Sequence, residues 1–181
     1  DRVAFSAGPG NDFFRDPASE KAIANAPLLW RPAPERFTLT ARVRPGLAST
    51  YDAGALFLYR DDEHWAKLAY EQTDMGYPAV VSVVTRGRSD DCNGEPWPTG
   101  EIWLRLSRSG VTLGLYYGAD GREWKMHRLL RVPGPPAEAE DGAERPRIGL
   151  SVQSPTGAGC RVAFEDIDWS EEPVSDFRKG R

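Results

Sequence analysis

The chain has 181 residues, of which 40% are hydrophobic and six are tryptophan, and this composition excludes an intrinsically disordered chain. Its 23 lysines and arginines against 27 aspartates and glutamates give a formal net charge of −4. That balance argues against nucleic acid as a partner, because phosphate binding needs a clustered basic face. No apolar run approaches the roughly 18 residues that cross a membrane, and no basic and apolar leader opens the chain. We therefore expect a soluble, cytoplasmic protein without a membrane partner.

Glycine and proline are abundant, at 18 and 15 residues, and long helices do not accommodate so many helix breakers. An alternation of apolar and polar side chains begins at Phe37 and returns at short spacing along the chain. It predicts strands at 37–44, 54–60, 65–72, 79–86, 102–108, 111–117, 124–130, 147–153 and 161–169. Many short strands without intervening helices predict an all-β fold, a two-sheet antiparallel β-sandwich of the jelly-roll kind.

The predicted domain organisation is simple. Residues 1–169 form a single β-sandwich domain, with residues 1–34 as an irregular, proline-rich leading segment that packs on it. Residues 170–181 are a charged C-terminal tail, and an exposed acidic loop lies between Pro133 and Pro146. Cys92 and Cys160 do not make a disulfide framework in a chain of this length, so we expect both to be free.

Each predicted strand divides into a core face and an outer face, because successive side chains point to opposite sides. The core faces are expected to carry Ala66, Leu68, Tyr70, Val81, Val83, Ile102, Leu104, Leu106, Ile148, Leu150 and Val152. The outer faces then carry Trp65, Lys67, Glu71, Ser82, Trp103, Arg105 and Gln153. If these strands share a sheet, the outer face is a polar groove with aromatic walls, which suits a sugar or another polar small molecule. The alternative is a solvated face with ordinary cross-strand ion pairs.

Motifs for other chemistry are missing from the sequence. His64 and His127 have no metal-ligand spacing, no glycine-rich phosphate loop precedes a helix, and there is no nucleophile elbow. We therefore expect no metal and no cofactor. A glycosidase needs two carboxylates, and Glu71 with Asp52 or Asp90 is a possible pair, so an enzyme with Glu71 as acid/base is the minority hypothesis.

Several motifs, taken together and in order, carry a family resemblance. They are Ala26-Pro27-Leu28-Leu29, Tyr51-Asp52-Ala53-Gly54-Ala55-Leu56-Phe57-Leu58, His64-Trp65-Ala66-Lys67-Leu68-Ala69-Tyr70-Glu71, Val81-Ser82-Val83-Val84-Thr85 with Ser89-Asp90, Trp103-Leu104-Arg105-Leu106-Ser107-Arg108, Asp120-Gly121-x-x-Trp124 and Gly149-Leu150-Ser151-Val152-Gln153-Ser154-Pro155. This set resembles the regulation-of-enolase-like domain family, whose function is largely uncharacterised, and the resemblance covers residues 12–169.

The resemblance implies a fold of the concanavalin A-like lectin/glucanase superfamily, with two antiparallel sheets, one of them curved. It carries over a set of candidate ligand-binding residues, which are Asp52, Trp65, Lys67, Glu71, Ser82, Thr85, Ser89, Asp90 and Arg105. The chain departs from the family where Asp91 follows Asp90 in place of a tryptophan, so a stacking wall would be weaker here.

Three functions follow as hypotheses. The first is a non-catalytic module that binds a carbohydrate or polyol, with Trp65 and Trp103 stacking on it and Lys67, Glu71, Arg105 and Gln153 bonding its hydroxyls. The second is the enzyme on the same face. The third is a protein-interaction domain that uses residues 1–34 or the loop at 133–146. Oligomeric state and ligand identity stay open.

Overall fold

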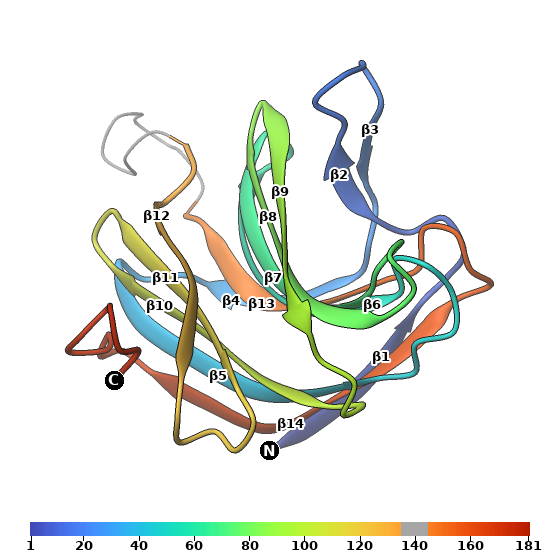
Figure 1. Cartoon of the computed structure of the whole chain (residues 1–181). Helices are drawn as coiled ribbons and strands as arrows, with labels where there is room; N and C mark the ends of the chain where they lie inside the picture. The colour runs from blue at the N-terminus through green and yellow to red at the C-terminus, as the bar shows by residue number, and fades with distance from the viewer. Residues whose placement is uncertain (135–144) are drawn as a thin grey trace.

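The computed structural model describes residues 1–134 and 145–181, and these residues form strands, turns and loops without a helix (Figure 1). The strands are β1 (Arg2–Ala7), β2 (Phe13–Arg15), β3 (Ala22–Ala24), β4 (Leu28–Pro32), β5 (Arg36–Pro45), β6 (Ala53–Asp61), β7 (His64–Gln72), β8 (Pro78–Arg86), β9 (Arg88–Pro96), β10 (Ile102–Ser109), β11 (Thr112–Gly118), β12 (Lys125–Arg131), β13 (Arg147–Gln153) and β14 (Cys160–Ser170). No helix that could cross a membrane occurs in this described part of the chain.

Two six-stranded antiparallel sheets pack face to face. The first sheet has the order β1-β14-β5-β10-β11-β12, and the second has the order β4-β13-β6-β7-β8-β9. Figure 1 shows the second sheet curving above the first, with β2 and β3 standing on the side that faces away from the first sheet. The predicted two-sheet antiparallel β-sandwich is confirmed. Strands distant in sequence, such as β13 and β6, lie side by side in it, as in a jelly roll.

The core between the sheets follows the predicted alternation in most strands. Leu68 of β7, Leu104 of β10 and Leu150 of β13 belong to one buried cluster, together with their neighbours two positions away. The prediction for β8 was wrong. Val80 and Val84 face the core with Ser82 between them, whereas Val83 packs on the outer face. The run 79–84 is almost entirely apolar, so it has no alternation that would define which face is inside.

Residues 1–34 are more regular than predicted. β1 pairs with β14 at the edge of the first sheet, and β4 pairs with β13 at the edge of the second. β2 and β3 pair with each other, and we call 12–25 the N-terminal hairpin. These short strands carry too few residues to show an alternation of apolar and polar side chains, so the sequence did not predict them.

The end of the chain is also packed and does not form a loose tail. We call residues 171–181 the C-terminal segment. Its Val174 is buried, and its carbonyl groups at Phe177 and Gly180 accept hydrogen bonds from Tyr116 and Arg105 of the first sheet. The acidic loop expected between Pro133 and Pro146 lies almost wholly outside the described residues.

Candidate functional site

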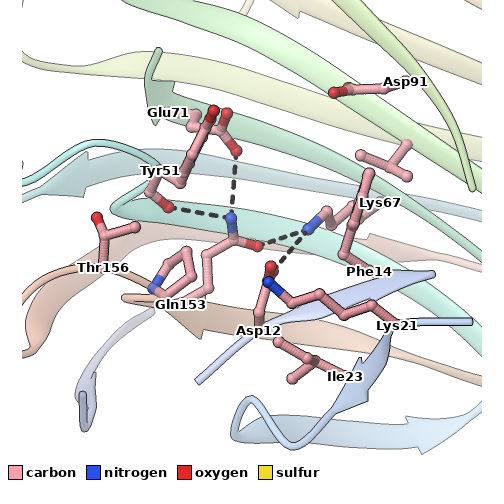
Figure 2. A pocket seen from close by; sticks show the side chains of 12 residues that line it. Asp12, Phe14, Lys21, Ile23, Tyr51, Lys67, Glu71, Asp91, Gln153 and Thr156 are labelled. Carbon is pink, nitrogen blue, oxygen red and sulfur yellow. Dashed lines mark hydrogen bonds and ion pairs between the residues drawn. The ribbon is translucent and has the colours of Figure 1, made fainter. Parts of the chain in front are cut away.

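A cavity of about 290 Å³ lies on the outer face of the second sheet, beneath the N-terminal hairpin. Polar and apolar side chains from the hairpin, from the loop before β6, from β7, β8 and β9, and from the end of β13 line it, and Figure 2 shows the cavity from close by. The lining residues are Asp12, Lys21, Lys67, Glu71, Asp91, Gln153 and Thr156, with Phe14, Ile23, Tyr51, Val83 and Pro155 among them. A concave, partly apolar site with a few convergent polar groups is typical of small-molecule binding.

Lys67 fastens the hairpin to the sheet. It lies mid-strand in β7 on the outer face, and only 2% of its surface is exposed. Its ammonium group donates to Phe13 O at 2.9 Å, to Gln153 Oε1 at 2.7 Å and to Asp12 Oδ1 at 3.3 Å. A lysine has three N–H donors, so this geometry uses all of them. Lys67 therefore positions its neighbours. It has no N–H group left for the predicted hydrogen bonds to ligand hydroxyl groups.

Gln153 is held in one orientation by its partners. The Lys67 ammonium group can only donate, so the amide oxygen must face it, and the amide nitrogen then donates to Tyr51 O at 3.0 Å and to Glu71 Oε2 at 3.2 Å. Figure 2 shows this chain of contacts running from Asp12 through Lys67 and Gln153 to Glu71. Both N–H groups of the amide are occupied within the protein.

Glu71 is the most perturbed acid of the cavity. The residue is 6% exposed, and burial raises the pKa of its carboxyl group from the usual 4.5 to about 8. The Lys67 ammonium group opposes this rise, while Asp91, Asp12 and Asp74 add to it. Among the described residues, Gln153 is the one hydrogen-bond partner of this carboxyl group, so one of its oxygens faces the cavity without a protein partner.

Tyr51 and Asp91 also line the cavity, although neither was among the predicted ligand-binding residues. Tyr51 is 37% exposed, lines the cavity and has a φ of 69°, a backbone conformation that is costly for a residue with a side chain. Asp91 lies at the exposed edge of the cavity, where loss of water around its carboxyl group raises its pKa. A signal for Asp91 was present, because it lies two residues after Ser89 and so on the same face of a strand, whereas nothing local distinguished Tyr51.

Three other predicted residues lie on or beside this face but support the structure. Trp65 is 1% exposed and packs under Phe13, so its ring is not available to stack on a ligand. Thr85 and Ser89 share a hydrogen bond at 2.8 Å, and the Ser89 hydroxyl accepts one from the backbone N–H of Arg15. They anchor β2 to the sheet.

Three predicted residues from the same half of the sandwich lie away from the cavity. Asp52 is fully buried and accepts hydrogen bonds from the backbone N–H groups of Ala48 and Ser49 and from the Ser154 hydroxyl, so it holds a turn together. Ser82 faces the core, where His127 contacts its hydroxyl at 2.9 Å, and Asp90 points to the opposite face from Asp91 and pairs with Arg128. The carboxylate pairs predicted between Glu71 and Asp52 or Asp90 are therefore not formed; Asp91 is the second acid of the cavity wall.

Trp103 and Arg105 belong to the other sheet. Both lie on β10, on the outer face of the first sheet, so the predicted single groove shared with Trp65 and Lys67 was wrong. Arg105 donates to Thr40 Oγ1 at 3.0 Å and to Gly180 O at 2.7 Å, and its guanidinium group stacks 3.9 Å from the ring centre of Trp124. Trp103 lies against Gly121 in the turn after β11. Arg105 holds the C-terminal segment, whereas Trp103 covers the turn after β11.

The site contains no evident metal-binding group. Within residues 1–134 and 145–181, no set of three or more His, Cys, Asp or Glu side chains converges as a metal site would require. Cys92 and Cys160 are free, and burial raises the pKa of the Cys160 thiol to about 12. The cavity is lined by carboxyl groups, two ammonium groups, an amide, a hydroxyl group and aromatic rings.

Solved structures share this fold. A functionally unknown protein from Saccharomyces cerevisiae has a TM-score of 0.84 and 23% identity over 96% of this chain and 89% of its own. A xylan beta-1,4-xylosidase from Bacillus halodurans C-125 has a TM-score of 0.72 and 15% identity over 93% of this chain. A Bacteroides ovatus protein described as xyloglucan PUL GH43B has a TM-score of 0.70 and 18% identity over 93% of this chain.

The match covers different shares of these proteins. This chain spans 32% of the length of the xylosidase and 32% of that of the Bacteroides ovatus protein. At such low identities the likeness shows a common fold and not a common function. No curated protein sequence matches the chain. A family model described as "Protein of unknown function (DUF1349)" matches residues 1–172, almost the entire chain. The chain therefore belongs to the DUF1349 family.

Proposed function

We propose that this chain binds a carbohydrate or a similar polyol in the cavity under the N-terminal hairpin, without catalysis. The observation that carries the proposal is that aromatic rings and carboxyl groups line the same cavity. The rings of Phe14 and Tyr51 border the same space as the carboxyl groups of Glu71 and Asp91. Sugar rings offer apolar faces to aromatic side chains and hydroxyl donors to carboxylates.

The size of the cavity supports this class of ligand. At about 290 Å³ it is at the lower end of the volumes usual for small-molecule sites, which favours a ligand of monosaccharide size over an oligosaccharide or a peptide. The xylan-degrading relative in fold makes pentoses reasonable first probes. We also propose the finer classification that the sequence resemblance implied, a regulation-of-enolase-like member of the concanavalin A-like superfamily, and a cytoplasmic location.

A second candidate is an enzyme on the same face. The raised pKa of Glu71 favours it, because a carboxyl group that is still protonated near neutral pH can act as a general acid. Asp91 supplies a second and better solvated carboxyl group, as a glycosidase requires. Turnover of aryl xylosides and glucosides that is lost in Glu71→Gln would establish this candidate in place of pure binding.

Thermal unfolding in the presence of pentoses, hexoses and their alditols tests the binding proposal. A ligand that binds only the folded state raises the melting temperature. The informative variant is Tyr51→Asn, which removes the ring and keeps a residue that tolerates a positive φ. We expect a shift in the wild type, loss of the shift in Tyr51→Asn and a retained shift in Tyr77→Asn, since Tyr77 does not line the cavity. The proposal fails if no compound shifts the wild type, or if Tyr51→Asn responds as the wild type does.

A further inference from the structure

The protein itself occupies most of the hydrogen-bond donors of the cavity. Lys67 uses its three N–H groups on Phe13, Gln153 and Asp12, and Gln153 uses both of its own on Tyr51 and Glu71. The Thr156 hydroxyl donates to the Thr50 carbonyl oxygen. Of the charged donors that line the cavity, Lys21 alone is exposed, and it belongs to the hairpin.

Acceptors, in contrast, are in excess. One oxygen of Glu71 has no partner among the described residues, and the Asp91 carboxyl group lines the same space. Glu71 is more than nine-tenths buried, so its unused oxygen can find a donor only in what enters the cavity. When Glu71 is ionised, a ligand that donates hydrogen bonds satisfies this oxygen, whereas an anionic ligand, such as a sugar phosphate or a uronic acid, is repelled by Glu71 and by the neighbouring carboxyl group of Asp91.

The charges around Glu71 also favour a particular charge on the ligand. Asp91 approaches from β9, Asp12 from the loop before β2, and Asp74 from the loop after β7, while Lys67 of β7 is a cation that acts on Glu71 and Lys21 of the hairpin lines the same cavity. Lys67 is already paired with Asp12. A positive charge on the ligand would therefore be attracted by Asp91 and Asp74 in addition to Glu71, and the rings of Tyr51 and Phe14 would add cation–π attraction.

We infer that the ligand of this cavity is a polyol with an ammonium group, of the amino-sugar class, and that its ammonium group binds the free oxygen of Glu71. The inference rests on the proposed function and specifies its substrate class. The hydroxyl groups of the ligand face Asp91 and the mouth of the cavity, and its apolar face lies against Tyr51. A neutral sugar of the same shape leaves the Glu71 carboxyl group without an ionic partner.

Binding of such a ligand is coupled to a proton. With a pKa of about 8 in the empty cavity, Glu71 is mostly protonated at pH 7, and the ammonium group of the ligand requires the carboxylate. Complex formation therefore releases a proton from Glu71 to solvent, and the number released per ligand falls as pH rises above 8. A neutral polyol leaves the proton in place.

Titration calorimetry at pH 7 in phosphate and in HEPES tests the inference, because the dependence of the heat on the buffer measures the released protons. The probes are two matched pairs, 6-amino-6-deoxy-D-glucose against D-glucose and 1-amino-1-deoxy-D-sorbitol against D-sorbitol. We expect each amine to bind at least tenfold more tightly than its neutral partner, with proton release. Both effects should vanish in Glu71→Gln, which keeps an acceptor for Gln153.

Neighbouring acids provide a matched control. Asp91→Asn should weaken amine binding several-fold, whereas Asp90→Asn, one residue away on the opposite face, should leave it unchanged. Equal binding of amine and neutral partner, or a preference that survives Glu71→Gln, overturns the inference and leaves the proposed function standing. If none of the four probes and no member of the sugar panel binds, both are overturned.

Discussion

The two outer faces of the sandwich carry the same kinds of residue and are used differently. On the second sheet, Lys67 lies beside Trp65 under the N-terminal hairpin, and on the first sheet Arg105 lies beside Trp124 under the C-terminal segment. Each cation donates to a backbone carbonyl group of the segment that covers it. The first arrangement borders a cavity that contains acidic groups. Whether a polar and aromatic strand face forms a binding cavity thus depends on the segment that covers the face.

The segments that cover the two faces explain the difference. The N-terminal hairpin is anchored at Phe13 and Arg15, and beyond these anchors it stands away from the sheet (Figure 1). The C-terminal segment instead places Gly180 directly on Tyr116 and Trp124, where a Cβ atom would have no room. A hairpin that spans the gap leaves a space, whereas a segment that lies flat fills it.

The largest expected effect is that of removing the cation under the hairpin. Lys67→Met leaves Asp12, Gln153 and the Phe13 carbonyl oxygen without their shared donor in a buried place, so the free energy of unfolding should fall by about 4 kcal/mol. Urea denaturation measures it. The exposed pair of Lys125 with Glu95 is the control, since Lys125→Met should cost less than about 1 kcal/mol. Similar losses in the two variants would contradict the anchoring role.

The next effect concerns pH. Because the folded state holds the pKa of Glu71 at about 8 and the usual value is 4.5, the folded protein binds this proton more tightly than the unfolded chain. The stability that the proton contributes is complete below pH 4.5 and is lost as pH rises to 8. Between pH 5 and pH 8 the wild type should lose on the order of 3 kcal/mol more than Glu71→Gln. Parallel stability curves for the two proteins would show that Glu71 titrates normally.

A smaller effect is expected on the other face. Arg105→Ala removes hydrogen bonds to Thr40 and Gly180 and the stacking on Trp124, at a cost of about 2 kcal/mol. Hydrogen exchange should become faster in the C-terminal segment, and binding in the cavity should not change. Arg178→Ala, at an exposed position of the same segment, is the control. Loss of ligand binding in Arg105→Ala would mean that the two faces are coupled.

The sequence predicted the sandwich well where strands alternate. Strands β5, β7, β10 and β13 lie within a residue or two of their predicted bounds, because one buried face imposes a period of two. β9 was missed because both of its faces are polar, from Ser89 to Glu95, and an edge strand needs no apolar face. The sequence did not predict which face of β8 is buried, because valines occupy both faces of this strand.

The site was only partly predictable. Lys67, Glu71 and Gln153 follow from alternation on β7 and β13, which are both neighbours of β6. The membership of Trp103 and Arg105 in another sheet does not follow from their own strand, because an identical alternation fits either sheet. The sequence also did not predict that the N–H groups of Lys67 are occupied within the protein. Their acceptors, Asp12 and the Phe13 carbonyl group, reach Lys67 because the hairpin folds back over β7.

The position of Asp91 on β9 has a further consequence. β9 is an outermost strand of the second sheet, and such a strand offers unpaired backbone groups to a strand of another molecule. Asp90, Asp91 and Glu95 place negative charge along it, and Pro96 ends it without a donor. Negative charge on a strand edge disfavours its pairing with a second copy, so Asp91, which borders the cavity, also acts against edge-to-edge pairing. Substitutions that neutralise the acidic side chains of β9 remove this repulsion and favour aggregation through the strand edge.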